Sequence, residues 1–229
     1  MPVRTSVVRA GWRDIDRIVD LITDTLSPTP LGAWLVPDEP CRSGVLAAVA
    51  RIWTEHALLF GDAFLLQGGT AATVWFHRYR PIPAPAGYGE RLGAACGPHR
   101  DRFLLLVRAL ATRRPVEAHN HLAFLAAPGP DRPNRAAAVL AGSQRWMDTL
   151  SLPTYAEVFT TADRDLHHRH GYTSREVIRL PGGGTAHPMW RLSPFRAGGR
   201  MSGNAAARWA ARPSPVRVRN DRVSGYVHP

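Results

Sequence analysis

The sequence predicts a mixed α/β (α+β) fold in a single domain, and three observations support it. A strand, loop, helix, strand and helix follow one another between His121 and Tyr172. Two segments rich in β-forming residues, 63–67 and 71–77, flank a Gly-Gly pair, which is typical of an antiparallel hairpin. Other segments carry apolar residues at helical spacing. Because strands and helices alternate in this way, we expect a sheet covered by helices.

Length and composition divide the chain into a domain, residues 1–194, and a tail, residues 195–229. With 229 residues and 45% hydrophobic side chains, the chain can form one sizeable core. The tail is rich in arginine, glycine and proline and has no apolar period, so we expect it to be disordered. The N-terminus lacks the apolar segment of a secretory signal, no apolar run reaches membrane-spanning length, and the two cysteines have no metal-binding spacing. We therefore predict a cytoplasmic protein with no metal.

The first part of the chain alternates short strands with longer helices. The alternating residue pattern of Thr5–Ala10 predicts a first strand. An apolar stripe at helical spacing predicts the first helix: Ile15, Ile18, Val19, Ile22 and Leu26. The turn signal of residues 27–30 ends this helix. Residues 31–40 have no period and are expected to be irregular. A second helix is predicted from Ser43 to Phe60, followed by a turn at Gly61-Asp62.

Two helices are expected between the hairpin and the central strand. Residues 81–85, Pro-Ile-Pro-Ala-Pro, predict a rigid extended link. Tyr88–Cys96 follows as a short helix, and Pro98 separates it from a helix over Asp101–Arg113. Pro115, Glu117 and His119 then lead into the strand.

The central stretch has the order of a βαβ unit. His121–Ala127 is a short apolar run, which we interpret as a buried strand, and a Pro- and Gly-rich loop at 128–133 ends it. From Arg135 the period becomes helical, until Pro153 introduces a second strand at Thr154–Phe159. Such a loop presents unpaired N–H groups at the N-terminus of a helix, and this geometry suits an anionic phosphate.

The net charge of +11 raises the possibility of nucleic-acid binding. Seven arginines follow residue 195 and only Asp221 opposes them, so the tail supplies +6 (7 − 1) and the remainder +5 (11 − 6). The basic residues are all arginine, which suggests a GC-rich coding sequence more than a selected patch. Nucleic-acid recognition is therefore disfavoured as the main function.

Five ordered segments carry a resemblance to a known family. They are His121-Leu-Ala-Phe-Leu-Ala-Ala127, Pro130-Asp131 with Arg135, Leu152-Pro-Thr-Tyr-Ala-Glu157, His168-Arg-His-Gly-Tyr172, and Leu180-Pro-Gly-Gly-Gly184 with Pro188-Met-Trp-Arg191. Together they resemble the Gcn5-related N-acetyltransferase (GNAT) superfamily, in particular its small actinobacterial members related to puromycin N-acetyltransferase. The resemblance implies a central mixed, mostly antiparallel twisted sheet with helices on both faces.

The phosphate-binding loop departs from the family pattern. In the register of the Gln/Arg-x-x-Gly-x-Gly/Ala motif, Pro133 replaces the first Gln and Ala136 and Ala138 replace the two glycines, while Arg135 is kept. The family allows alanine at the second position, but alanine at the first mildly obstructs close approach of a phosphate, and proline removes a donor. The resemblance therefore implies a degenerate loop and weakened binding of coenzyme A.

The resemblance also implies where acetyl-CoA binds. The strand end at Leu125, Ala126 and Ala127 is expected to part from its neighbour and to pair with the pantetheine arm. The pyrophosphate is expected to contact side chains and N–H groups of Arg132, Arg135, Ala136, Ala137 and Ala138. The alternative for the two arginines is a solvated loop.

Two residues are candidates for catalysis. Glu157 matches the family's strand-end glutamate, which implies a general base acting through water, and the alternative is a structural hydrogen bond. His167 stands where the family often places a tyrosine that protonates the leaving thiolate. Imidazolium can serve as the acid near neutral pH, and relaxed constraint is the alternative.

The acceptor side is predicted from aromatic and polar residues that the resemblance places near it. Trp34 is expected as a lid or core residue or a ligand contact, and Trp75 either stacks on a substrate ring or packs in the core. Glu117, His119 and His121 either hold an acceptor ammonium and relay a proton, or form a hydrated strand entrance.

These expectations combine into one function and two alternatives. The chain is predicted to be an N-acetyltransferase that moves an acetyl group from acetyl-CoA to a small-molecule amine, such as an antibiotic or aminonucleoside, and to be a monomer or homodimer without membrane contact. The alternatives are a catalytically degenerate binding protein with the same fold and a basic nucleic-acid-binding protein.

Overall fold

Eight strands form the mixed sheet on which residues 6–194, the part that the computed structural model describes, are built. The strands are β1 (Val7–Arg9), β2 (Gly61–Leu66), β3 (Ala72–Arg78), β4 (His119–Ala126), β5 (Thr154–Val158), β6 (Thr173–Ser174), β7 (Ile178–Arg179) and β8 (Thr185–Arg191). Their order is β1-β2-β3-β4-β5-β8-β6, with β7 also paired to β8. All neighbouring strands in this part of the chain are antiparallel except β4 and β5, which are parallel.

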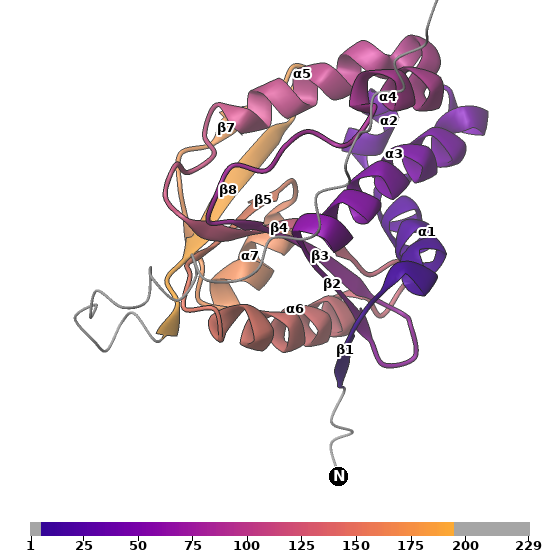
Figure 1. Ribbon diagram of the computed structural model, residues 1–229. Coiled ribbons are helices and arrows are strands. Elements are labelled where there is room, and N and C mark those ends of the chain that lie inside the picture. The colour runs from indigo at the N-terminus through magenta and orange to yellow at the C-terminus, as the bar shows by residue number, and fades with distance from the viewer. Residues whose placement is uncertain (1–5, 195–229) are drawn as a thin grey trace, which may run out of the picture. The chain divides into compact units, whose positions relative to one another are not determined.

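Helices cover both faces of this sheet (Figure 1). They are α1 (Ile15–Leu26), α2 (Pro30–Leu35), α3 (Glu39–Phe60), α4 (Tyr88–Cys96), α5 (Arg100–Ala111), α6 (Arg132–Asp148) and α7 (Thr161–Arg169). Helix α6 lies below the sheet in Figure 1, and α3, α4 and α5 lie above it. The predicted fold class, a mixed and mostly antiparallel sheet with helices on both faces, is confirmed.

Side chains alternate between the two faces of the sheet and form one hydrophobic core on each face. On one face Trp75, Leu122 and Met189 pack with Val139 and Leu140 of α6. On the other face, residues of α1 and α3 pack against residues of β2 and β3. The helical residues are Ile18, Ile22 and Ala57, and the strand residues are Ala63, Val74 and Phe76. Since neighbouring residues of a strand point to opposite faces, Trp75 and Phe76 belong to different cores.

Strands β4 and β5 pair over only three positions. The parallel register runs from Asn120 opposite Thr154 to Leu122 opposite Ala156 and then stops. Ala123 is an extra residue in β4, because Val74 pairs with Phe124 while its neighbour Trp75 pairs with Leu122. A bulge of this kind bends the strand that carries it. Beyond Leu122 the edge of β4 that faces β5 has no strand partner within residues 6–194.

Three predicted elements are wrong in detail. Residues 31–35, expected to be irregular, belong to α2, because the Thr29 hydroxyl accepts a hydrogen bond from the Gly32 N–H and Pro30 stands in the first turn. Helix α3 begins at Glu39 rather than Ser43. Gly61 and Asp62 are the first residues of β2 rather than a turn.

Other predicted elements agree closely with the structure. Helix α4 has the predicted bounds, Tyr88–Cys96, and α1 spans Ile15–Leu26 around the predicted apolar stripe. Strand β4 begins at His119, two residues before the predicted start. None of the helices in residues 6–194 is long and apolar enough to cross a membrane. The predicted tail, residues 195–229, lies outside the described residues.

Candidate active site

A cavity of about 670 Å³ opens where β4 and β5 separate. Its volume is within the range of small-molecule sites. Residues 123–126 of β4 form one wall, and α1, α2, α3 and α5 supply apolar side chains to the others. The cavity also collects charged and imidazole side chains: Arg78, Arg114, His121, Arg132, Glu157, Asp163 and His167.

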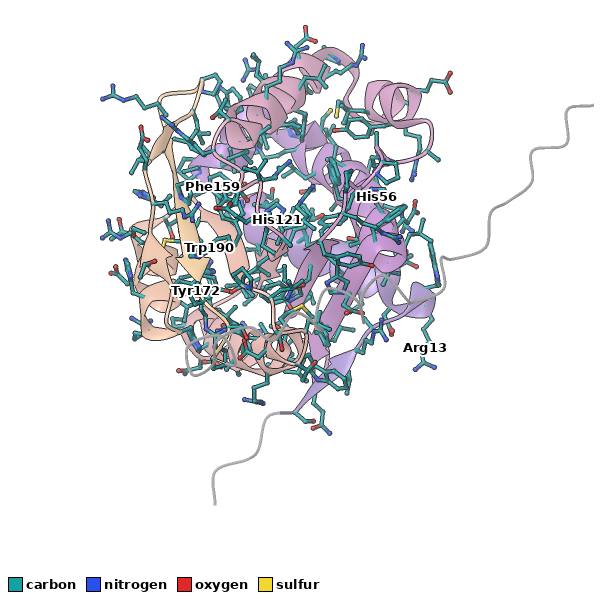
Figure 2. All side chains as sticks on the ribbon, turned by 60° about the vertical axis from the view of Figure 1, so that its left-hand side comes forward. Arg13, His56, His121, Phe159, Tyr172 and Trp190 are labelled. Carbon is teal, nitrogen blue, oxygen red and sulfur yellow. The ribbon has the colours of Figure 1, made fainter. Side chains whose placement is uncertain are left out.

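His121 and Glu157 form a buried pair in this cavity. His121 is opposite Tyr155 in the parallel register, so Glu157 is the next residue of β5 on the same face. The Nε2 atom of His121 lies 2.6 Å from Oε2 of Glu157, and the two side chains are 6% and 5% exposed. Figure 2 shows His121 near the middle of the domain, between Phe159 and Trp190 on one side and His56 on the other.

The neighbours of His121 determine which ring nitrogen carries its proton. The Nε–H of Arg78 donates to Nδ1 of His121 at 3.2 Å, so Nδ1 is the acceptor and Nε2–H donates to Glu157. Burial lowers the pKa of His121, although the Glu157 carboxylate acts in the opposite direction. His121 is therefore neutral at neutral pH.

Glu157 is ionised in the same environment. Burial acts to raise its pKa, but His121 and Arg114 more than offset burial, so the pKa lies below the usual value. Its second oxygen, Oε1, is buried and has no hydrogen-bond partner within residues 6–194. The Tyr155 hydroxyl faces this carboxylate, and burial followed by the carboxylate charge raises the pKa of Tyr155. The site thus presents a carboxylate oxygen that is free to accept a proton or an ammonium N–H.

Two arginines lie beside this pair. Arg78 comes from the end of β3 and Arg114 from the segment after α5, and both line the cavity. Burial, followed by repulsion from Arg114, lowers the pKa of Arg78 to about 10. Arg78 therefore remains charged at neutral pH.

Aromatic side chains form an apolar wall at the same end. The ring of Trp53 lies 6.1 Å from that of Phe76 and 5.4 Å from that of Tyr88, centroid to centroid. Trp34 lies beneath Gly182 of the β7–β8 turn, so closely that a Cβ at Gly182 would stand 2.2 Å from the Trp34 ring. The predicted lid role of Trp34 is consistent with this position, since both residues line the cavity.

The residues predicted to bind coenzyme A divide into two groups. Leu125, Ala126 and Arg132 line the cavity, and Arg132 forms an ion pair of 2.7 Å with Asp163. The backbone N–H of Ala127 instead donates to the Thr25 hydroxyl at 3.0 Å.

The remaining residues of the predicted phosphate loop are occupied by the fold itself. The guanidinium of Arg135 donates to the backbone carbonyls of Pro128 and Thr70, so it holds the loop in place. Ala136 is fully buried in the core, and Ala137 and Ala138 pack against it. These four residues do not line the cavity.

His167 lines the cavity, but its protonation state differs from the expected one. Its Nδ1–H donates to the Asp163 carbonyl at 2.8 Å, and Nε2 is buried without a partner in the described chain. Burial lowers the pKa of His167 to about 4. The ring is therefore neutral near pH 7 and presents a proton acceptor, so the expected imidazolium acid does not form there.

Three residues predicted for the acceptor side lie elsewhere. Trp75 is fully buried on the opposite face of the sheet, where it packs against α6, because the strand register places Phe76 on the cavity side. Glu117 is exposed, and its backbone carbonyl accepts a hydrogen bond of 2.7 Å from His119. His119 is buried behind His121, against Tyr155 and Trp190, and burial lowers its pKa to about 4.

His121, Arg78 and Arg114 were missing from the predicted catalytic set. The sequence indicated His121 only as one of three polar residues near the strand entrance. The alternation of β4 separates it from Leu122 and places it with Glu157. Arg78 and Arg114 are distant in sequence, and no local signal places either of them in the cavity.

Comparison with known proteins supports the fold. The sequence matches no family model and no curated protein. The structure is similar to that of an acetyltransferase from Corynebacterium glutamicum, described as histone acetyltransferase HPA2 and related acetyltransferase, with a TM-score of 0.64 and 21% identity over 87% of this chain and 98% of that chain.

Two further solved structures have names that state an acceptor. The polyamine N-acetyltransferase of Drosophila melanogaster matches with a TM-score of 0.57 and 17% identity over 81% of this chain and 98% of that chain. An agmatine N-acetyltransferase matches with a TM-score of 0.56 and 16% identity over 82% of this chain and 99% of that chain. At these identities the likeness establishes the architecture alone. Residues 6–194 therefore have the fold of the GNAT acetyltransferases.

Proposed function

We propose that this chain is an N-acetyltransferase that uses acetyl-CoA to acetylate a small-molecule amine. The observation that carries the proposal is the buried His121–Glu157 pair, which lies in a cavity beside the point where β4 and β5 separate. An amine acceptor must lose a proton during acyl transfer, and Glu157 offers a free carboxylate oxygen for it. Antibiotic- and aminonucleoside-like amines remain the class that the sequence resemblance implies.

The free edge of β4 supports binding of the pantetheine arm of the proposed donor. The β5-facing edge of β4 beyond Leu122 offers backbone groups without a strand partner within residues 6–194, and Leu125 and Ala126 line the cavity there. Acetyl-CoA would supply the thioester, and these backbone groups would pair with the amides of its pantetheine arm.

The pyrophosphate would meet fewer contacts. Arg132 and the first turn of α6 favour an anion, but the N–H groups of Arg132 and Arg135 already donate to backbone carbonyls and Pro133 has no N–H. Asp131 precedes the helix, and its negative charge opposes a phosphate. We therefore expect that most of the affinity for coenzyme A comes from the pantetheine arm.

The proposed reaction needs a proton acceptor more than a proton donor. Glu157 binds the acceptor ammonium and accepts its proton, while the hydrogen bond from His121 Nε2 fixes the orientation of the carboxylate. The nitrogen of the amine forms a bond to the acyl carbon and the carbon–sulfur bond breaks. The products are the amide, the free thiol and one proton lost to solvent.

A second candidate function is a binding protein that keeps the fold without turnover. Pro133 and the neutral His167 favour it, since one removes a phosphate-binding N–H and the other cannot act as an imidazolium acid. This candidate and the enzyme make different predictions only for cofactor binding and turnover.

Thermal unfolding with increasing acetyl-CoA tests the proposed cofactor. A ligand that binds only the folded state stabilises it by RT ln(1 + [L]/Kd), or about 2.7 kcal/mol at a hundredfold excess over Kd. Above Kd we expect the melting temperature to rise with the logarithm of the acetyl-CoA concentration, and to rise with a similar slope for S-acetylpantetheine. An unchanged melting temperature at millimolar concentrations of both ligands would contradict the proposal.

A further inference from the structure

Arg78 and Arg114 place two positive charges in the cavity beside the His121–Glu157 pair, and neither forms an ion pair with an acidic side chain of residues 6–194. From this arrangement we infer that the acceptor amine carries a carboxylate, as an α-amino acid does, and that the two arginines bind that carboxylate. The inference rests on the proposed function, because it specifies the acceptor of the same site.

Arg78 is held in place and still has unused hydrogen-bond donors. Its Nε–H donates to His121 Nδ1 at 3.2 Å, and its guanidinium carbon lies 5.7 Å from the centroid of the Phe76 ring. The terminal nitrogen atoms of this guanidinium make no hydrogen bond within residues 6–194. A guanidinium with a fixed plane and free terminal N–H groups suits a carboxylate, because the two groups form paired hydrogen bonds.

Arg114 completes the positive side of the cavity. Its Nε atom is buried without a hydrogen-bond partner in the described chain. Its charge lowers the pKa of Glu157 and of Arg78, so it lies within electrostatic reach of both. A buried N–H without a partner destabilises the fold, and an anionic ligand would remove that penalty.

The charges of the cavity identify a zwitterion as the best complement. Arg132 and Asp163 neutralise each other at 2.7 Å, and His121 and His167 are neutral near pH 7. The remaining charges are two arginines and Glu157, so the acceptor end carries a net charge of +1 (2 − 1). An acceptor ammonium pairs with Glu157 while its carboxylate pairs with the arginines.

The rest of the acceptor end is apolar. Trp34, Trp53, Phe76 and Tyr88 line it and carry no charge at neutral pH. An apolar or aromatic side chain on the acceptor would contact these rings. A polyamine or agmatine is poorly suited, because its second cationic group would meet Arg78 or Arg114 without a free carboxylate to balance it.

Amines matched with and without a carboxylate provide the test. The pairs are phenylalanine with phenethylamine, leucine with isopentylamine, and methionine with 3-(methylthio)propylamine, and agmatine serves as the dication. Thiol release from acetyl-CoA gives kcat/KM for each. We expect at least one amino acid to exceed its amine partner by about tenfold or more, which is the size of one hydrogen bond to a charged group, and agmatine to be the poorest acceptor.

The Arg114→Gln variant tests the role assigned to Arg114. The measured quantity is kcat/KM for an amino acid divided by kcat/KM for its amine partner. We expect this ratio to fall by about tenfold or more, because the variant removes the charge that favours the carboxylate. Arg113→Gln is the matched control: Arg113 is the neighbouring residue, it pairs with the exposed Glu176, it does not line the cavity, and its loss leaves the ratio unchanged. The inference would be overturned if kcat/KM for each plain amine equalled or exceeded that for its amino acid and if Arg114→Gln left this ratio unchanged. The proposed acetyltransferase would remain intact.

Binding separates the inference from the proposed function if thiol release is absent for every acceptor. Each amino acid and its amine are then compared as stabilisers in thermal unfolding. Stabilisation by an amino acid that is lost in Arg114→Gln supports the carboxylate site while the acetyltransferase fails. Absence of stabilisation by all three amino acids, together with absence of turnover, overturns both.

Discussion

The Nε2 atom of His121 lies 2.6 Å from Oε2 of Glu157, and the two residues come from strands that pair in parallel only as far as Leu122 and Ala156. The pair therefore stands at the end of the shared register, where the cavity begins. Its protons are ordered: Arg78 donates to His121, and His121 donates to Glu157. The free oxygen of Glu157 is the atom on which the proposed chemistry depends.

Glu157→Gln is expected to lower kcat/KM for the acceptor by about 10²–10⁴-fold, the usual contribution of general acid–base catalysis. The amide keeps the size of the side chain but cannot accept the proton. Steady-state thiol release measures the effect, and circular dichroism checks that the fold is kept. Glu176→Gln is the matched control, because Glu176 is 71% exposed and pairs with Arg113. Equal activity of the Glu157 variant and the control would exclude Glu157 as the base.

Arg132→Gln is expected to raise the KM for acetyl-CoA more than the KM for S-acetylpantetheine, which lacks the pyrophosphate. Arg132 lines the cavity and stands in the first turn of α6, where an anion is favoured. The readout is the ratio of the two KM values, expected to change by about tenfold for one lost charged hydrogen bond. An unchanged ratio would show that Arg132 serves only its ion pair with Asp163.

Acidification is expected to destabilise the fold between pH 6.5 and about 4, because burial lowers the pKa of His167 and of His119 to about 4. In that range the unfolded chain binds protons that the folded chain excludes, so the free energy of unfolding falls as the pH falls. Each histidine contributes up to about 1.4 kcal/mol per pH unit.

Urea unfolding at pH 7 and pH 5 measures this effect. His167→Asn keeps a donor for the Asp163 carbonyl and removes one titrating group, so its loss of stability on acidification should be smaller than that of the unaltered chain. His168→Asn is a control on the same helix. Stability that is flat between the two pH values would contradict the buried neutral state of these rings.

Gly61→Ala is expected to lower the free energy of unfolding by about 1–3 kcal/mol through overpacking. A Cβ at Gly61 would stand 1.9 Å from the Trp75 carbonyl oxygen, so β2 and β3 would have to move apart. Gly44→Ala is the control, since Gly44 lies within α3 with nothing within 4 Å of its Cβ position and should be stabilised by about 0.5–1 kcal/mol. Equal stabilities of the two variants would show that the strands adapt at no cost.

The sequence predicted the fold class well because strongly periodic segments determine it. The stripe of α1 and the end of α4 follow from local signals: a regular apolar spacing in one, and Pro98 shortly after the other. Element starts were less predictable. Pro30 indicated the end of a helix, yet it stands in the first turn of α2, because proline suits that position as well.

The candidate site was predicted only in part because it depends on strand register. Glu157, which the family resemblance implied as a strand-end residue, lies within β5 and lines the cavity. Trp75 was offered as a stacking residue, but a shift of one position along β3 exchanges it with Phe76. His121 and Arg78 meet through pairing between residues 43 positions apart, which no local pattern encodes.

The most direct test of the central claim is thiol release from acetyl-CoA by the full chain, with amino acids and plain amines as acceptors, compared between the unaltered protein and Glu157→Gln. The structure predicts saturable release that depends on the acceptor and falls at least about a hundredfold in the variant. Release that is absent for all acceptors, or that is equal in the two proteins, would contradict the proposed acetyltransferase and favour a binding protein with the GNAT fold.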